Sequence, residues 1–513
     1  MLYKLGFKLK FYKISVIYLF LFCCVACTKT SPLETALRLS GDNRPELEKV
    51  LMYYQDDSLK YVAACFLIEN MPGKYGMKAE NAEDPYKHFL QHIPALDPIS
   101  WELDLSLIAC QLDSVSRLAV PCQRKVEDLK CITAEYLIDN IDWAFRAWEE
   151  SPSTSHYSFD DFLRYVLPYR IGHEPLTSWR GKAYQRYRHL MDSVYTPRQV
   201  ATSIALNGGI RYNVGMTKYP YVQSYEEMAK GRWGLCVDLA AYQALSLRAI
   251  GIPASCDFVP AWANRNSGHC WGVLKDTTGR FIDLGYDPGG ENRIIYKVSK
   301  INRKDYASTG SVDVTSQYAM PQSELCFPVS DEYEGRTVSL CTFNNRDWVP
   351  VAFAVCRNGS AVFPSVGQGV LWGKNQLRPC MEPGRGIVYV AKVFQDGIWI
   401  PVAHPVVLHE DGTVRWLQAD EENRMPLELV RKYPYYGKNY SRPYDSNCVR
   451  KGDLYELRYW KEGWQSLGLQ TAESDNSLRY DSVSRNALLW LHNHSGGVEE
   501  RIFTYENGKQ VWW

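Results

Sequence analysis

The sequence predicts an α+β protein with a helical N-terminal region, a mixed core and C-terminal β-sandwich-type domains. Residues 31 to about 155 carry apolar side chains at helical spacing. A helical pattern followed by a β-hairpin pattern occupies residues 236–288. From about Val338 onward, turn dipeptides such as Asp396-Gly397, Asp411-Gly412 and Asn507-Gly508 separate β-rich runs. This regular spacing is typical of β-sandwiches.

The first 27 residues have the composition of a secretory signal. Four lysines precede an apolar run at residues 14–26, and no acidic residue is present. The run is too short to span a bilayer. Cys24-Val25-Ala26-Cys27 resembles a bacterial lipobox, although Cys24 stands where leucine is usual. We therefore expect export, cleavage before Cys27 and lipidation of its thiol. The outer membrane is favoured, because Thr28 stands where an aspartate is associated with inner-membrane retention. An uncleaved anchor and a buried helix are the alternatives.

Helices are predicted throughout the region before the core. Apolar residues recur at helical spacing over residues 45–54, 59–67 and 126–136, and Met71-Pro72-Gly73 ends the second of these segments. Further helices over residues 179–194 and 197–206 lead into the core. None of these segments carries a pattern that indicates a chemical site.

Residues 236–250 are predicted to form the helix on which the site depends. Gly231 and Gly234 break the structure before it, and Gly251 followed by Pro253 ends it. Cys236 therefore lies in the first helical turn. Free backbone N–H groups and the positive end of the helix dipole favour a thiolate there, which is the nucleophilic form of cysteine. The same N–H groups can hold an oxyanion.

A base for this thiol is predicted on the strand at residues 267–275, which contains His269. Asp276-Thr277-Thr278-Gly279 fits a turn that returns the chain antiparallel. If Asp276 pairs with Arg280, Asp287 comes to lie across from His269 while Asp283 faces Val273. At about 3.4 Å per residue, Asp283 is then roughly 14 Å from the histidine along the strand. Asp287 is favoured as the acid, and Asp283 remains the alternative because a bulge at Gly285 would shift the register.

These residues together resemble the transglutaminase-like core of the papain-like cysteine enzymes. The resemblance rests on Gly234 and Cys236, on residues 247–254, on His269 with Trp271, and on Asp287-Pro288. It implies an α+β core with a triad of Cys236, His269 and Asp287 acting on amide bonds. The sequence departs from the family pattern in having Cys270 after the histidine and in lacking a well-placed aromatic residue before the acid.

The resemblance covers about a fifth of the chain, and outside the core it has a weaker counterpart. Residues 43–47 and 66–72 are similar to the helical lead-in of exported bacterial transglutaminase-domain proteins. The expected substrate is a peptide or protein, with cell-wall stem peptides as a candidate suggested by location. Peptide hydrolysis or glutamine deamidation is favoured over crosslinking.

Other interpretations of the same residues remain open. A cysteine at a helix start is often a small buried apolar residue, and a histidine on an apolar strand is often structural. A metal site built from Cys236, Cys256, His269 and Cys270 is not expected, because no Cys-x-x-Cys pair occurs among them and adjacent strand residues point to opposite faces. The rival function is a catalytically inactive envelope protein that binds glycan or protein through its β-domains.

The sequence suggests five divisions, which are a signal (1–27), a helical domain (28–155), the core (156–300), a β-rich domain (301–431) and a C-terminal β-rich domain (432–513). The last boundary is placed at the Tyr/Pro/Gly stretch of residues 432–437, which has the composition of a linker. Residues 511–513 are predicted to pack with the last strand.

Composition excludes some functional classes. The 58 basic and 58 acidic residues balance, so no charge excess indicates nucleic-acid binding. Aromatic residues make up 13% of the chain. Such an excess suits glycan-stacking surfaces, although no glycan-binding motif is present. No cofactor is expected. Few or no disulfides are expected either, because the cysteine spacing is irregular.

Overall fold

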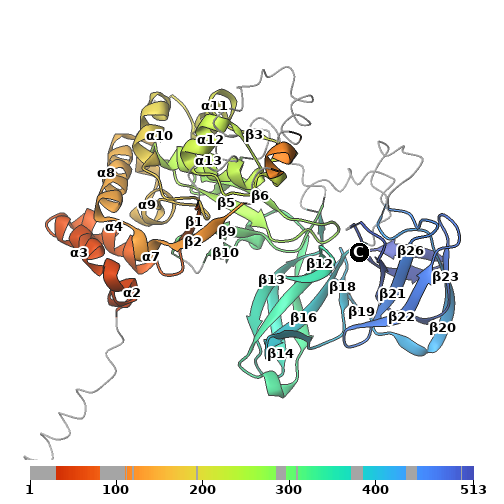
Figure 1. Ribbon diagram of the computed structural model, residues 1–513. Helices are drawn as coiled ribbons and strands as arrows, with labels where there is room; N and C mark the ends of the chain where they lie inside the picture. Colours follow the sequence, from red (N-terminus) through yellow and green to blue (C-terminus); the bar gives the residue numbers. More distant parts are fainter. Residues whose placement is uncertain are drawn as a thin grey trace, which may run out of the picture.

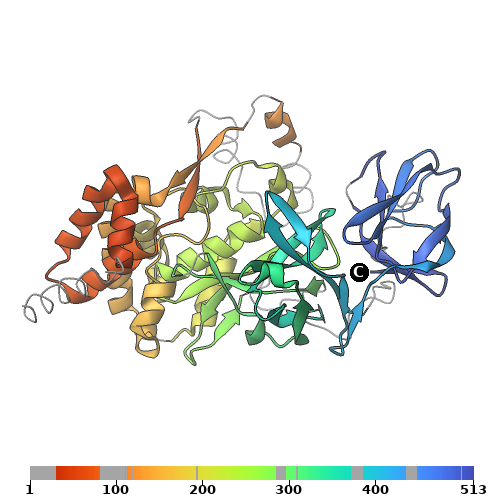
Figure 2. The same ribbon diagram turned by 90° about the horizontal axis from the view of Figure 1, so that it is seen from below.

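Helices gather in the N-terminal half of the described chain and strands in the C-terminal half, which confirms the predicted α+β class (Figure 1). The structure is a computed structural model. It describes residues 31–80, 110, 112–117, 121–191, 194–284, 296–307, 310–370, 385–434, 447–497 and 499–513. Figure 2 shows the helical region, the mixed core and the two β-domains following one another along the molecule. Cys27 and Asp287 lie outside the described residues.

The helical region packs around one apolar core that includes Leu47, Leu67 and Ile141. The first two predicted helices are confirmed. The Asp57 carboxylate accepts from the Lys60 N–H at 3.1 Å and caps the second of them. The helices of this region are α2 (Pro32–Ser40), α3 (Arg44–Tyr53), α4 (Ser58–Glu69) and α8 (Ala134–Glu150).

The third predicted helix, at residues 126–136, is wrong. Its first part belongs to β2 (Gln123–Glu127), which pairs antiparallel with β1 (Tyr75–Ala79). After α7 (Asp128–Cys131) the chain becomes extended, and the Thr133 hydroxyl accepts from the Tyr136 N–H at 3.2 Å to start α8. Cross-strand pairing and this cap therefore override the helical spacing of the apolar residues.

Further helices surround the core. The helix predicted over residues 179–194 is shorter than expected, because it ends at Tyr187 and a 3₁₀ turn, Arg188–Leu190, follows. The helices are α9 (Phe159–Tyr165), α10 (Trp179–Tyr187), α11 (Pro197–Asn207), α12 (Tyr225–Gly231) and α13 (Cys236–Arg248).

The core sheet has five antiparallel strands in the order β10-β9-β5-β6-β7. One face packs against α13 through Leu274, Cys256 and Ala244, and the other carries Trp271 and Val273. Two of its strands follow residue 300, where the predicted core ends. The strands are β5 (Ala254–Val259), β6 (His269–Lys275), β7 (Phe281–Asp283), β9 (Asn302–Lys304) and β10 (Ser311–Asp313).

The first β-domain packs two sheets around one apolar core. The larger sheet contains β12 (Thr337–Asn344), β13 (Asp347–Val355), β16 (Ile387–Gln395), β17 (Ile398–Pro401), β18 (Val406–Leu408) and β19 (Val414–Trp416), and the smaller contains β11 (Gln322–Pro328) and β14 (Ser360–Gly367).

The C-terminal β-domain has its own apolar core, and the last strand holds the chain end in place as predicted, with Trp513 buried. Residues 435–437 of the expected linker lie outside the described residues. The strands are β20 (Asp420–Leu429), β21 (Leu454–Trp460), β22 (Trp464–Thr471), β23 (Leu478–Arg485), β24 (Leu489–Asn493), β25 (Ile502–Glu506) and β26 (Lys509–Trp512).

The turns predicted between β-strands are formed as expected. Asp396-Gly397 joins β16 to β17, and Asn507-Gly508 joins β25 to β26, with positive φ at all four residues. Within the described part of the chain, no helix is long and apolar enough to cross a membrane.

Candidate functional site

The start of α13 is fixed by a close approach that only glycine permits. A Cβ atom on Gly234 would lie 2.6 Å from the Asp238 Cβ and 3.1 Å from the Ile210 Cδ1. The Asp238 carboxylate accepts from the Leu235 N–H at 2.8 Å, which satisfies one donor before the helix. Cys236 is half-buried and is the first helical residue, as predicted.

The Asp238 carboxyl therefore lies in the first helical turn together with the Cys236 thiol. Burial raises the pKa of the Asp238 carboxyl to about 6. Sequence reasoning missed this residue, although an acid three residues after a helix start is a recognised capping signal.

Helix α13 and strand β6 run in the same direction. At the end of the helix, the Arg248 Nε donates to the Ala254 carbonyl at 2.9 Å, where β5 begins. Midway, Gln243 lies directly over Gly272, because a Cβ on Gly272 would be 2.6 Å from the Gln243 Oε1. Cys236 lies seven residues before Gln243, about 10 Å along the helix. His269 lies three residues before Gly272, also about 10 Å along the strand. Cys236 and His269 therefore lie at the same end of the helix–strand pair.

The His269 ring lies among aromatic side chains on the sheet face away from α13. It stacks on Trp262 with centroids 5.7 Å apart and planes inclined by 24°, and its centroid is 5.4 Å from that of Trp271. Burial lowers the pKa of His269 to about 4. The imidazole is therefore neutral at pH 7, which is the form that accepts a proton.

Four side chains connect the surroundings of the Cys236 thiol with those of the His269 ring. Tyr212 pairs in register with Gly234, beside Cys236. Burial raises the pKa of Tyr212, the charge of the Cys236 thiolate raises it further, and Arg265 lowers it. The Arg265 guanidinium carbon lies 4.3 Å from the Tyr296 ring centroid, and the Tyr296 ring is 5.3 Å from Trp262. No sequence pattern pointed to Tyr212 or Arg265.

The hairpin after His269 has the predicted register. The Asp276 N–H donates to the Arg280 carbonyl at 2.8 Å, Gly279 has φ 81°, and Val273 pairs with Asp283. The Leu284 N–H donates to the Gly272 carbonyl at 3.0 Å, which continues the ladder by one residue. Asp283 therefore lies four positions from His269, roughly 14 Å along the strand at about 3.4 Å per residue. The structure does not bring Asp283 to the imidazole.

Trp271, two residues after the histidine, is held by a buried polar network. Its Nε1 donates to the Tyr318 hydroxyl at 3.1 Å, and that hydroxyl donates to the Asp257 carboxylate at 2.6 Å. Arg303 pairs with both oxygens of Asp257, each at 2.8 Å. This network ties β9 to β5 and fixes the aromatic wall beside His269. The charged pair was not predicted, because its partners are 46 residues apart in the sequence.

The other cysteines near His269 lie on the opposite sheet face. Cys270 and Cys256 pack in the apolar cluster with α13, as strand alternation predicts. A hydrogen bond with Cys256 and burial raise the pKa of the Cys270 thiol well above its ordinary value. Cys270 is therefore a poor nucleophile at neutral pH.

The fold and this arrangement define an α+β protein with a cysteine at a helix start and a histidine at the start of a neighbouring strand. No protein-family model matches the chain, and no curated protein matches it. A search of solved structures finds the crystal structure of red sea bream transglutaminase at 12% identity, covering 87% of this chain and 78% of that one, with a TM-score of 0.19. A score this low carries no argument about the fold or the activity of this protein.

Proposed function

We propose that the protein is a cysteine enzyme that acts on amide bonds, with Cys236 as nucleophile and His269 as base. The observation that supports this proposal is that α13 and β6 run in the same direction, so that Cys236 and His269 lie at the same end of the helix–strand pair. Both residues are only half-buried. The sequence resemblance to transglutaminase-like enzymes points to the same residues independently.

The proposed reaction follows from the two groups. The imidazole takes the proton of the Cys236 thiol, and the sulfur attacks the amide carbonyl carbon to form a C–S bond. Collapse of the oxyanion breaks the C–N bond, and the imidazolium returns its proton to the departing amine. Water then hydrolyses the thioester. The position of Cys236 in the first turn of α13, at the positive end of the helix dipole, favours the thiolate.

The neutral imidazole explains why a third group is needed. Burial disfavours the imidazolium that forms during the reaction, so an adjacent carboxylate is required to stabilise it. We assign this role to Asp287, which follows from continuing the observed ladder beyond Leu284. A bulge that moves Asp283 toward the ring is the alternative, and the observed Val273–Asp283 pairing argues against it.

Thiol labelling tests the proposal. In full-length protein treated with iodoacetamide between pH 5 and 9, mass spectrometry should find Cys236 labelled rapidly below pH 7. His269→Gln should slow labelling at pH 6.5 by roughly tenfold or more, because an unassisted thiol of pKa about 8.5 is almost entirely protonated there. The exposed Cys326 is the internal control and should label at the same rate in both proteins.

Two aspartate variants separate the candidates for the acid. Asp287→Asn should slow labelling of Cys236, whereas Asp283→Asn should leave it unchanged. Loss in the Asp283 variant alone would overturn the assignment of the acid. If Cys236 shows the pH profile of Cys326, the enzyme proposal fails.

A second candidate function is binding through the first β-domain. A cavity of about 330 Å³ lies on its larger sheet and is lined by Phe353, Phe394, Trp399 and Arg336, and the three aromatic residues are exposed. Exposed rings beside polar groups suit stacking on sugars or contact with a protein. Trp399→Ala should weaken retention on a glycan array if glycan is the ligand. If Trp399→Ala leaves retention unchanged and Cys236 is labelled rapidly below pH 7, the enzyme function is favoured over glycan binding.

We also propose that the protein is exported and held in the cell envelope, at the outer membrane, by a lipid on Cys27. The support is the signal-like composition of the first 27 residues. Metabolic labelling with an alkyne fatty acid should mark the wild type and fail with Cys27→Ala. Labelling that persists in the variant contradicts this anchor.

A further inference from the structure

A cavity of about 280 Å³ lies where the helical region meets the core. Four separate segments line it, which are residues 72–75 at the start of β1, residues 170–173, Arg248 at the end of α13, and residues 304–306 with Gly310 at and beyond the end of β9. Arg248 is twelve residues from Cys236, about 18 Å along the helix at 1.5 Å per residue. The cavity is therefore separate from the candidate catalytic site.

Positive side chains dominate the described lining. The lining contains Lys74, Arg170, Arg248 and Lys304 and one carboxylate, that of Asp305, which is paired with Arg164. Arg170 is paired with Asp128 behind the wall. The Lys74 Nζ lies 5.1 Å from the ring centroid of Tyr306, and burial lowers the pKa of this lysine. The described lining thus contains more basic than acidic side chains, which favours a negatively charged occupant.

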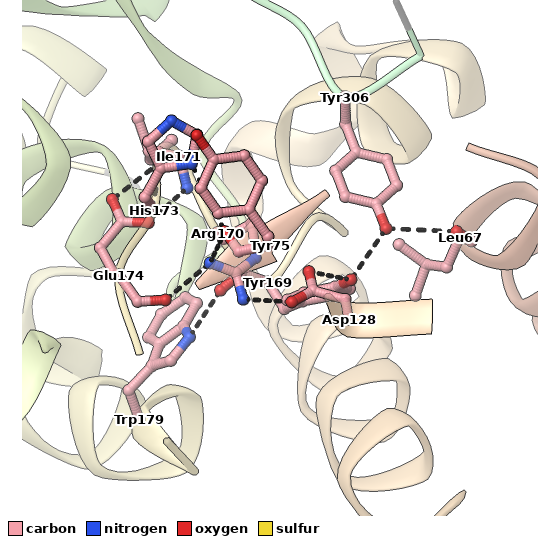
Figure 3. Close-up of polar contacts among 11 residues, drawn as sticks. Leu67, Tyr75, Asp128, Tyr169, Arg170, Ile171, His173, Glu174, Trp179 and Tyr306 are labelled. Atoms are coloured by element: carbon pink, nitrogen blue, oxygen red, sulfur yellow. Dashed lines mark hydrogen bonds and ion pairs between the residues drawn. The ribbon is translucent and has the colours of Figure 1, made fainter. Parts of the chain in front are cut away.

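Arg170 has a donor that no described protein group satisfies. Its Nη1 donates to the carbonyls of Tyr75 and Glu174, and its Nη2 donates to the Asp128 carboxylate at 2.7 Å (Figure 3). The side chain is 4% exposed, and its buried Nε–H has no hydrogen-bond partner in the part of the chain that the structure describes. An unpaired buried donor costs about 1–3 kcal/mol, so an acceptor here would be stabilising.

The carboxylates behind this wall are already engaged. Asp128 accepts from the Tyr169 hydroxyl at 2.9 Å as well as from Arg170. The Glu174 carboxylate accepts from the Gly172 N–H at 2.9 Å. Neither the Asp128 nor the Glu174 carboxylate lines the cavity, so neither takes the place of an anionic ligand inside it.

Arg248 is a buried cation whose hydrogen bonds, among the described residues, go to backbone carbonyls. Its guanidinium donates to the carbonyls of Ala254, Pro168 and Arg170 at 2.9–3.1 Å, and no carboxylate is among these partners. Burial lowers the pKa of Arg248 to about 10, so it remains charged at pH 7. Its charge gives the cavity a fixed positive end.

We propose that this cavity binds a small ligand bearing an oxyanion, either a phosphate or a carboxylate. The anion accepts from the Arg170 Nε–H and is attracted by Arg248, Lys74 and Lys304. The rim offers a flat surface, because the His173 and Tyr75 rings stack 4.0 Å apart with planes inclined by 11°. Since the lining joins the helical region to the core, an occupant stabilises the contact between them.

Calorimetric titration of the full-length protein tests this site with inorganic phosphate in one arm and succinate in the other. Sodium chloride holds the ionic strength constant, so that general screening does not contribute. We expect saturable binding with one site in at least one arm. The arm that saturates identifies the anion chemistry.

Lys304→Gln and Lys74→Gln should each raise the dissociation constant at least tenfold. The matched control is Lys451→Gln, an exposed lysine of the C-terminal β-domain, which should bind as the wild type does. Melting temperatures without anion show that each variant is folded, and Lys304→Gln carries the test if Lys74→Gln is not. The absence of saturable binding in both arms, or equal affinity in the wild type and Lys304→Gln, overturns the proposal.

Discussion

The aromatic surroundings of His269 predict a pH dependence of core stability. The imidazole stacks on Trp262 and lies beside Trp271, and burial lowers its pKa from 6.5 to about 4. Between these two values the unfolded chain binds a proton that the folded protein does not. The stabilising contribution is therefore fully present above about pH 6.5 and is lost as the pH falls toward 4.

The size of the effect follows from the shift. A difference of about 2.5 pKa units at 1.36 kcal/mol per unit gives roughly 3 kcal/mol over the whole window. The His269→Gln variant loses ring packing at every pH but does not titrate. The free-energy difference between the wild type and this variant should therefore shrink by up to about 3 kcal/mol between pH 7.5 and pH 4, and a carboxylate beside the ring, as proposed for Asp287, reduces this change.

Hydrogen exchange measured by mass spectrometry on peptides covering β6 reports the unfolding free energy of the core rather than that of the whole chain. Comparing the wild type with His269→Gln at several pH values removes the contributions that both proteins share. His189→Gln, a change at an exposed histidine, is the control and should show no such pH-dependent difference. A difference between the wild type and His269→Gln that stays constant across the pH range would refute the reasoning.

Two further predictions concern the groups that position the site. Gly234→Ala should destabilise the core by about 1–3 kcal/mol in urea unfolding, because the new Cβ overlaps Asp238; the control Gly172→Ala, whose nearest atom is 3.6 Å away, should not. Asp257→Asn should cost about 3–5 kcal/mol, because it leaves the buried Arg303 without its counter-charge. A cost below about 1 kcal/mol would show that the pair is dispensable.

The site elements that were predicted correctly depend on local interactions. α13 begins at Cys236 because Gly234 allows the Asp238 side chain to approach, and Gly251 with φ 79° follows its end. The hairpin register follows from the hydrogen bond between Asp276 and Arg280, four residues apart. These contacts involve neighbours in the chain, so their signals are present in the sequence itself.

The failed helix at residues 126–136 shows the limit of such reasoning. Apolar spacing favoured one helix, but Val126 pairs with Gly76 across two strands, 50 positions away in the chain. Nothing in residues 126–136 specifies that partner. Pairing between distant segments is decided by how well the whole chain packs.

By itself, the sequence determined the α+β class, the helix that presents Cys236 and the hairpin that follows His269, because local turns, caps and periodicity encode them. Only the tertiary structure decided that α13 and β6 start at the same end, that the half-buried imidazole stacks on Trp262, and that four distant segments enclose a cavity lined mainly by basic side chains. Burial and charge compensation depend on which segments meet. The free energy that brings them together comes from the packed core as a whole.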